Sequence, residues 1–146
     1  MEIFRSPVII AGQSQGYAKG TIAKEAKGIV FLAGALGSDP VTGVVPEGAG
    51  EQAKLAMEAI KLRLEEFGSS LENILHIWIY MKGQFPDGIA NDSGWREASK
   101  SIQDFWKINH PEFQWKVNPP AITLLGVTSL VLPQYKLEIE VAAAVA

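Results

Sequence analysis

Near the middle of the chain, the spacing of apolar residues changes from a helical pattern to a strand pattern. Between residues 51 and 67 apolar side chains recur at steps of three or four, which predicts an amphipathic helix that ends at Gly68. The residues on this stripe are Ala53, Met57, Ile60, Leu64 and Phe67. Residues 74–81, ILHIWIYM, alternate instead, so His76, Trp78 and Tyr80 share one face of a predicted strand and residues 75, 77, 79 and 81 share the other. A helix joined directly to such a strand requires a fold in which helices pack on a sheet.

The remaining elements extend this pattern over the chain. An apolar run at 29–33 between two glycines predicts a buried strand, and an apolar stripe at 94–107 predicts a second helix, with Asp92 or Ser93 as its cap. Further strands are expected at 121–130 and 135–143. The order is two strands, of which only the one at 29–33 is located, then a helix, a strand, a helix and two strands. It predicts one α+β domain over residues 1–146, a mixed sheet with both helices on one face.

Helices on one face leave the other face of the sheet without a cover. The predicted strands are rich in apolar residues, and an exposed apolar patch of several hundred Å² is unusual in a monomer. Burial by identical chains is the simplest solution, so we expect a homo-oligomer.

Composition excludes several function classes. The sequence has no cysteine, which rules out disulfides, thiolate metal sites and a cysteine nucleophile. Its 13 basic and 16 acidic residues give a net charge of -3 without a basic cluster, so we expect no nucleic-acid partner. No segment has the length and hydropathy of a signal peptide or a membrane span, so we expect a soluble, cytoplasmic protein without a membrane partner.

The sequence gives little support for a metal site, a dinucleotide-binding turn or a catalytic serine. His76 and His110 are far apart, and no second ligand stands at a suitable spacing, so no metal site is expected. The glycines of residues 33–37 follow a strand but lack the third glycine of a dinucleotide-binding turn. No serine stands in a nucleophile-elbow pattern.

Two other features are candidates for a site. Trp115 lies between the second helix and the next strand, where an aromatic side chain suits the wall of a pocket. Glu138 and Glu140 project from one face of the last strand. Such a pair forms a solvated edge, an interface pair or, in a cleft between chains, a carboxylate that handles a water proton.

A series of motifs occurs in a fixed order along the chain. It comprises GIVFLAG at 28–34, DPVTG at 39–43, EQA at 51–53, PA at 120–121, LLGV at 124–127, Leu130, Pro133 and LEIEVA at 137–142. In this order the motifs resemble the Rid family, also called YjgF-like proteins, from about Tyr17 to the C-terminus. The resemblance implies a chorismate-mutase-like α+β fold and a homotrimeric barrel, with a small-molecule site in each cleft between chains. It also implies that no cofactor and no metal take part.

Members of the Rid family with the full site hydrolyse reactive enamines and imines to a ketone or keto acid and ammonia. By this resemblance Glu138 positions the attacking water, and Tyr17 corresponds to a tyrosine near the N-terminus of the family. Asn91 is similar to the asparagine of a connecting loop. Ala33 stands where many members have serine, which leaves the backbone near Gly34 to contact the substrate.

Ile122 is the main departure from the family pattern. In the deaminating members an arginine at this position pairs with the substrate carboxylate through two parallel hydrogen bonds. Isoleucine cannot form this pair, and Leu124 makes the same strand face apolar. An unpaired carboxylate buried there loses several kcal/mol of hydration. We therefore expect poor hydrolysis of small carboxylated substrates such as 2-aminoacrylate.

Two functions remain open from the sequence. The first is hydrolysis of an imine or enamine that is uncharged or more apolar than 2-aminoacrylate. The second is a non-catalytic trimer that binds a small metabolite in its clefts or a protein partner on its surface. Ribonuclease activity, translation inhibition and chaperone-like behaviour have also been associated with the Rid family, but the negative charge and the lack of a histidine pair disfavour ribonuclease activity.

Overall fold

The computed structural model describes all 146 residues. The strands are β1 (Glu2–Ile10), β2 (Gln13–Lys24), β3 (Gly28–Phe31), β4 (Ala35–Leu36), β5 (Ile74–Lys82), β6 (Ala121–Val127) and β7 (Leu137–Val145). The helices are α1 (Ala49–Glu66), α2 (Ser93–Asn109) and two short 3-10 turns, η1 (Leu71–Asn73) and η2 (Ile89–Asn91). Neither of the long helices has the apolar length that a membrane crossing needs.

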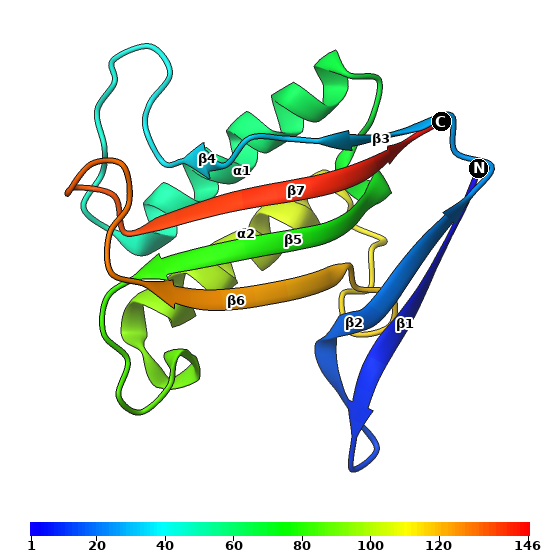
Figure 1. Cartoon of the computed structure of the whole chain (residues 1–146), viewed down its shortest axis with the longest axis horizontal. Coiled ribbons are helices and arrows are strands. Elements are labelled where there is room, and N and C mark those ends of the chain that lie inside the picture. The colour runs from blue at the N-terminus through cyan, green and yellow to red at the C-terminus, as the bar shows by residue number, and fades with distance from the viewer.

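All strands belong to one mixed sheet. Its order is β1-β2-β6-β5-β7-β3, and β4 also pairs with β7. β6 runs parallel to β2 and β5, whereas the other pairs are antiparallel. Both α1 and α2 lie behind the sheet in Figure 1, and no helix covers the face toward the viewer. This arrangement confirms the predicted α+β fold with a mixed sheet and both helices on one face.

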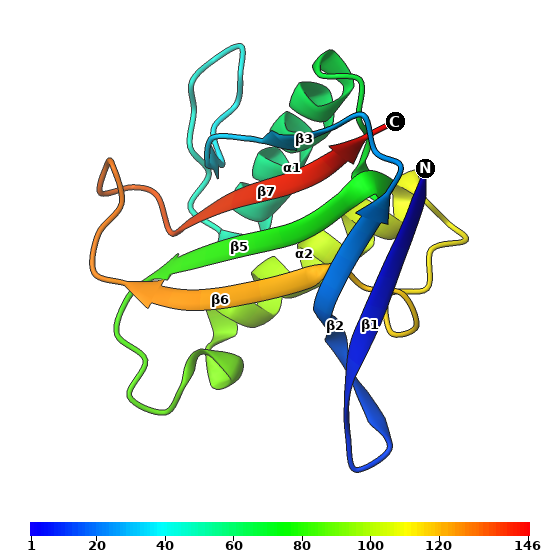
Figure 2. The same cartoon turned by 45° about the vertical axis from the view of Figure 1, so that its right-hand side comes forward.

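The N-terminal hairpin of β1 and β2 adds strands that the sequence prediction did not locate. Figure 2 shows the hairpin beside β6, inclined to the central strands. Its turn is Ala11-Gly12, with φ angles of 48° and 77°. A two-residue turn with two positive φ values suits the twist of a hairpin, but it is usually marked by Asn-Gly or Asp-Gly. Pro7 also interrupts the pairing register, so the hairpin has neither a strong turn signal nor a regular alternation.

The structure shifts the ends of several predicted elements. Phe67, expected on the buried stripe of the first helix, is instead the C-cap of α1 and is 58% exposed. The strand expected at 121–130 ends at Val127, because its partner β5 ends opposite it at Lys82. The strand expected at 135–143 extends to Val145, because β3 provides a partner up to that residue. Asp92 caps α2 as predicted, and its carboxylate accepts a hydrogen bond of 3.0 Å from the backbone N–H of Trp95.

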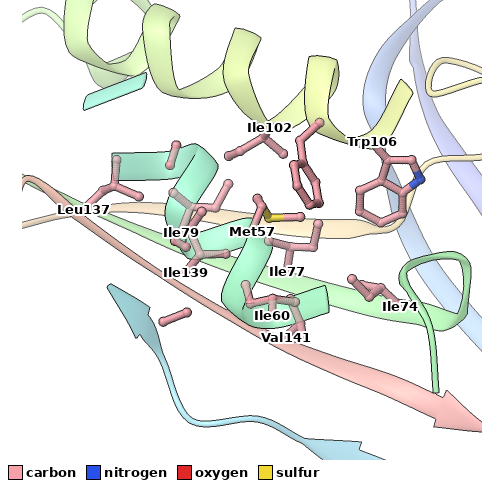
Figure 3. Packing of buried hydrophobic residues seen from close by; sticks show 14 of the residues in the cluster. Met57, Ile60, Ile74, Ile77, Ile79, Ile102, Trp106, Leu137, Ile139 and Val141 are labelled. Carbon is pink, nitrogen blue, oxygen red and sulfur yellow. The ribbon is translucent and has the colours of Figure 1, made fainter. Parts of the chain in front are cut away.

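The core fills the layer between the sheet and the helices. Figure 3 shows Met57 and Ile60 of α1 and Ile102 and Trp106 of α2 packed together with side chains of β5 and β7. The strand residues of this layer include Ile77, Ile79, Met81, Leu137, Ile139 and Val141, all at most 2% exposed. Full burial of one such aliphatic side chain stabilises the fold by about 1.5–3 kcal/mol.

The prediction of which β5 residues face the core was wrong at the start of the strand. Leu75 was expected in the core, but it is only half-buried, and Ile74 is 0% exposed in its place. The pairing with β7 is irregular between Ile74 and His76, and this extra residue reverses the alternation. From Ile77 onward the predicted alternation is confirmed.

The sheet face without helices, called the open face below, carries a half-buried row on β5 that consists of His76, Trp78 and Tyr80. The rings of His76 and Trp78 stack with centroids 3.9 Å apart, and His76 Nε2 lies 3.0 Å from Thr123 Oγ1. Burial lowers the pKa of His76, so its neutral form is favoured. The β5 row of the open face therefore presents uncharged aromatic surface.

Candidate functional site

A cavity of about 740 Å³ lies on the helix side of the sheet, between α2, β5, β6 and the beginning of β2. Its aliphatic lining comprises Ile77, Ile79, Ile102, Ile122 and Leu124. Three aromatic side chains, Tyr17, Trp95 and Trp115, also line it, and Ser14, Gln15, Ser99, Gln103 and Lys116 supply side-chain polar groups. A mostly apolar cavity of this size with a few polar groups is typical of a small-molecule site.

Two segments that are far apart in sequence form one wall of the cavity. The indole Nε1 of Trp115 donates a hydrogen bond of 2.8 Å to the carbonyl of Gly16, and Ser14 Oγ donates one of 2.6 Å to the carbonyl of Lys116. Gly16 has a φ of 77°, which favours glycine, and the Trp115 ring lies 3.6 Å from where a Cβ at Gly16 would be. These contacts fix Tyr17 and Trp115 at the cavity wall.

The floor of the cavity includes Ile122 and Leu124. In the parallel register they lie beside Ile77 and Ile79 of β5, which are 0% and 2% exposed. Neighbouring residues in such a register share a face of the sheet, so Ile122 and Leu124 point to the helix side. The position where the resemblance expects an arginine therefore forms part of an apolar floor.

Asn91 lies next to the cavity without lining it. It ends η2, and its neighbour Ala90 is a lining residue. The Asn91 side chain is exposed, and its Nδ2 donates a long hydrogen bond of 3.3 Å to the carbonyl of Asp87.

Glu138 lies on the opposite side of the sheet from the cavity. It is paired with Tyr80 in the register of β5 and β7, and both residues belong to the open face. Its carboxyl group packs on Gly34, where an added Cβ would lie only 2.6 Å from Glu138 Cδ. Ala33 is exposed beside it, and its carbonyl accepts a 3.3 Å hydrogen bond from Arg63. Within one chain the candidate residues therefore form two groups, one at the cavity and one around Glu138.

The second carboxylate of the strand, Glu140, is hydrogen-bonded to a tyrosine. The hydroxyl group of Tyr80 donates a hydrogen bond to Glu140 Oε1. This hydrogen bond, followed by burial and the negative charges of Glu140 and Glu138, raises the pKa of Tyr80 to about 12. Glu140 is thus already engaged in a hydrogen bond, whereas Glu138 has no hydrogen-bond partner within the chain.

The Tyr80 hydrogen bond predicts a pH dependence. Because the pKa in the folded protein is above the ordinary value of 10.0, the stabilisation is complete below pH 10 and is lost as the pH rises towards 12. In an ultraviolet titration of the three tyrosines, we expect one phenol to ionise near pH 12. This step should be absent in Tyr80→Phe and should move towards pH 10 in Glu140→Gln. Ionisation of all three phenols together near pH 10 would contradict the assignment.

Part of the cavity lining was missed from the sequence. Trp95 falls within the apolar stripe that predicts the second helix, but it is half-buried and lines the cavity together with Ser99 and Gln103. These residues follow one another at steps of four on α2, so they share one side of the helix, and Gln103 Nε2 donates a 3.2 Å hydrogen bond to Ser99 Oγ. This spacing is a signal for a polar stripe beside the apolar one. No group of three histidine, aspartate or glutamate side chains is placed to hold a metal ion.

Comparisons with known proteins extend over nearly the whole chain. The family model described as Endoribonuclease L-PSP matches residues 11–145. A RutC family protein of Aquifex aeolicus is 30% identical over 139 residues, which are 95% of this chain and 93% of that protein. A RutC family protein of Pyrococcus abyssi is 41% identical over 54 residues, which cover 36% of this chain and 42% of the relative.

Solved structures show the same fold at low identity. E. coli TdcF, solved with bound serine, is 23% identical with a TM-score of 0.65, and the match covers 97% of this chain and 94% of TdcF. The YjgF gene product of E. coli is 21% identical with a TM-score of 0.64, over 96% of this chain and 93% of that one. Since the family model spans most of the sequence and a relative of 30% identity covers nearly all of it, the chain belongs to the Endoribonuclease L-PSP family, the Rid or YjgF-like proteins that its motifs resemble.

Proposed function

We propose that the protein hydrolyses a reactive imine or enamine whose side chain is larger and more apolar than that of 2-aminoacrylate. The observation that carries this proposal is the cavity of about 740 Å³ with Ile122 and Leu124 on its floor. An apolar floor favours an apolar substituent, and it leaves a small carboxylate without a hydrogen-bonding partner. The bound serine of TdcF supports a small-molecule site on this fold, although it is a ligand of that protein.

The proposed site is completed between two copies of the chain. Glu138 and the cavity lie on opposite faces of the sheet, so the two do not meet within one chain. A homotrimer with clefts between chains, as the family resemblance implies, would bring the Glu138 of one copy to the cavity of the next. The uncovered aromatic row of the open face supports such an assembly, because contact with another copy removes its surface from water.

The chemistry needs one water molecule and one carboxylate. Water adds to the carbon of the protonated C=N bond while Glu138 accepts one proton from the water, which gives a neutral carbinolamine. The protonated carboxyl group then gives this proton to the amine nitrogen. As the C–N bond breaks, the hydroxyl proton passes back to the carboxylate and from there to solvent, and a carbonyl compound and ammonia leave. An imine already hydrolyses in water, so the protein contributes mainly by holding the water and the imine carbon close together.

A series of imines of increasing size tests this proposal. An amino-acid oxidase generates them in place from alanine, leucine and phenylalanine, and competition with semicarbazide measures how fast each one is hydrolysed. We expect acceleration to rise from the alanine product to the phenylalanine product. In Ile122→Arg, a gain on the alanine product is expected, because the guanidinium can pair with the carboxylate. No acceleration of any imine by the wild type would contradict the proposal.

A second candidate function is non-catalytic binding. It is favoured by the absence of a carboxylate or histidine from the cavity lining of the chain. A ligand that binds only the folded state raises the melting temperature in proportion to the logarithm of its concentration. An increase of this kind with the imine products and without turnover would support binding alone.

A further inference from the structure

We propose that Lys116 provides an anion site at the mouth of the cavity, so that the preferred ligand is an aromatic carboxylate rather than a neutral aromatic compound. An aryl-substituted 2-imino acid and its 2-oxo acid product belong to this class. The inference rests on the proposed function only in taking the cavity as the ligand site.

Lys116 is the single charged residue among the 15 that line the cavity. It takes part in none of the ion pairs of the chain, and no carboxylate lines the cavity. An ammonium group at the edge of an apolar cavity attracts an anion more strongly than it does in open water, because the apolar wall lowers the local dielectric constant. The cavity lining thus has one unpaired positive charge, which lies on the segment around Lys116 and not at Ile122 on the floor.

The backbone around Lys116 is fixed against the hairpin. Its carbonyl accepts the 2.6 Å hydrogen bond from Ser14, and the preceding Trp115 is held by its 2.8 Å hydrogen bond to Gly16. The N–H of Val117 also closes a turn on the carbonyl of Gln114, at 3.0 Å. The ammonium group is therefore attached to an ordered segment of the cavity wall, although the lysine side chain itself is exposed.

The size of the cavity determines the rest of the ligand. Its volume of about 740 Å³ equals that of roughly 25 water molecules in the liquid. A small carboxylate bound to Lys116 leaves most of the apolar lining in contact with water. A ligand with an aromatic ring covers that lining and can stack on Trp95 or Trp115. A ligand with a ring at the floor and a carboxylate at the mouth contacts both the apolar lining and the ammonium group of Lys116.

Calorimetric titration of unreactive probes tests the anion site separately from turnover. The probes are 3-phenylpropanoate, its neutral amide 3-phenylpropanamide, and propanoate. We expect wild-type protein at low salt to bind the phenyl acid about fivefold more tightly than the amide, the size expected of one exposed ion pair. Propanoate should bind at least about tenfold more weakly than the phenyl acid. Salt should remove the preference for the acid over the amide.

Two lysine variants complete the test. In Lys116→Met the acid and the amide should bind equally, whereas Lys107→Met, which removes an exposed lysine of α2 outside the cavity, should keep the wild-type preference. Equal binding of acid and amide by the wild type, or a preference that survives in Lys116→Met, would overturn the anion site. Absence of binding by all three probes would overturn both the anion site and the cavity as a ligand site. A Lys116-dependent preference without imine hydrolysis would support this inference and reject the proposed function.

Discussion

Replacing Glu138 with glutamine should lower the rate of imine hydrolysis about 100-fold or more, while the affinity for a neutral ligand such as 3-phenylpropanamide stays the same. The amide has nearly the shape of the carboxylate, but it cannot accept a proton from the attacking water, and general-base catalysis typically contributes 10²- to 10⁴-fold. Glu138 is not among the residues that line the cavity of its own chain, and a neutral ligand has no charge for the neighbouring copy's Glu138 to repel, so its binding depends on the apolar lining. Steady-state kinetics and calorimetric titration measure the two effects separately.

Glu140→Gln is the matched control for this variant. Glu140 lies on the same strand and the same face, but it is hydrogen-bonded to Tyr80 and does not pack on Gly34. The Glu140→Gln substitution should lower the pKa of Tyr80 and leave the rate of hydrolysis within a few-fold of the wild type. If the two glutamine variants lose equal activity, Glu138 has no special role.

Mixing two inactive variants tests whether the site is shared between copies. One variant is Glu138→Gln, and the other is Leu124→Trp, which places a bulky indole on the floor of the cavity and blocks substrate there. In randomly mixed trimers, one site in four combines an intact Glu138 from one copy with an intact cavity from its neighbour, so about a quarter of the wild-type activity should return. If both parts of the site came from a single chain, mixing would restore nothing.

Replacing Gly37 with alanine should destabilise the fold by about 3 kcal/mol or more, as measured by urea unfolding. The added Cβ would lie 2.3 Å from the carbonyl oxygen of Gln52 and 2.4 Å from its Cα. Both are backbone atoms of α1, so no side-chain rotation can relieve the overlap. Either the helix or the segment after β4 must shift.

A shift of α1 or of the segment after β4 in Gly37→Ala would also disturb the buried side-chain amide of Gln52. Gln52 is 0% exposed, and its Nε2 donates hydrogen bonds to the carbonyls of Pro46 at 2.7 Å and Gln134 at 3.1 Å. Its Oε1 accepts a 2.8 Å hydrogen bond from the N–H of Lys136. Each buried polar group left without a partner costs about 1–3 kcal/mol. The loss in Gly37→Ala therefore combines steric overlap with the loss of these hydrogen bonds.

Gly20→Ala is the control for Gly37→Ala. A Cβ added at Gly20 has no heavy atom within 4 Å, and the residue has no positive φ. Its free energy of unfolding should stay within about 0.5 kcal/mol of the wild type. Equal stability of the two variants would show that the segment after β4 adapts freely.

The sequence predicts best the elements whose signal is local. The helical stripe from Ala53 to Leu64 and the alternation from Ile77 to Met81 each depend on burial of one face, and both were confirmed. The cap at Asp92 depends on a single carboxylate near the first turn of the helix and was also confirmed. The hairpin of β1 and β2 was not located, because Ala11 in its turn has a positive φ, which an alanine in the sequence does not indicate.

The arrangement of the candidate site could not be predicted in the same way. Alternation shows which residues of one strand share a face, but not which faces of two strands coincide. Only the register through β5 shows that Ile122 and Glu138 are on opposite sides of the sheet. The cavity also combines residues 14–17, 95–103 and 115–116, and the hydrogen bonds that join the first of these segments to the last have no local sequence pattern.

The junction of the hairpin with the rest of the sheet is narrow. β2 pairs with β6 at a single position, Ala18 opposite Ala121, while the three central strands are paired along most of their length. Arg5 and Thr21 also anchor the inner end of the hairpin through hydrogen bonds to the carbonyls of Glu72, Ile74 and Leu75. Changes in the length or tilt of the hairpin beyond these anchors therefore leave the folding core largely untouched, yet they move the wall that carries Tyr17. Evolution can thus adjust the width of the binding chamber through the N-terminal segment alone, without trading away the stability of the scaffold.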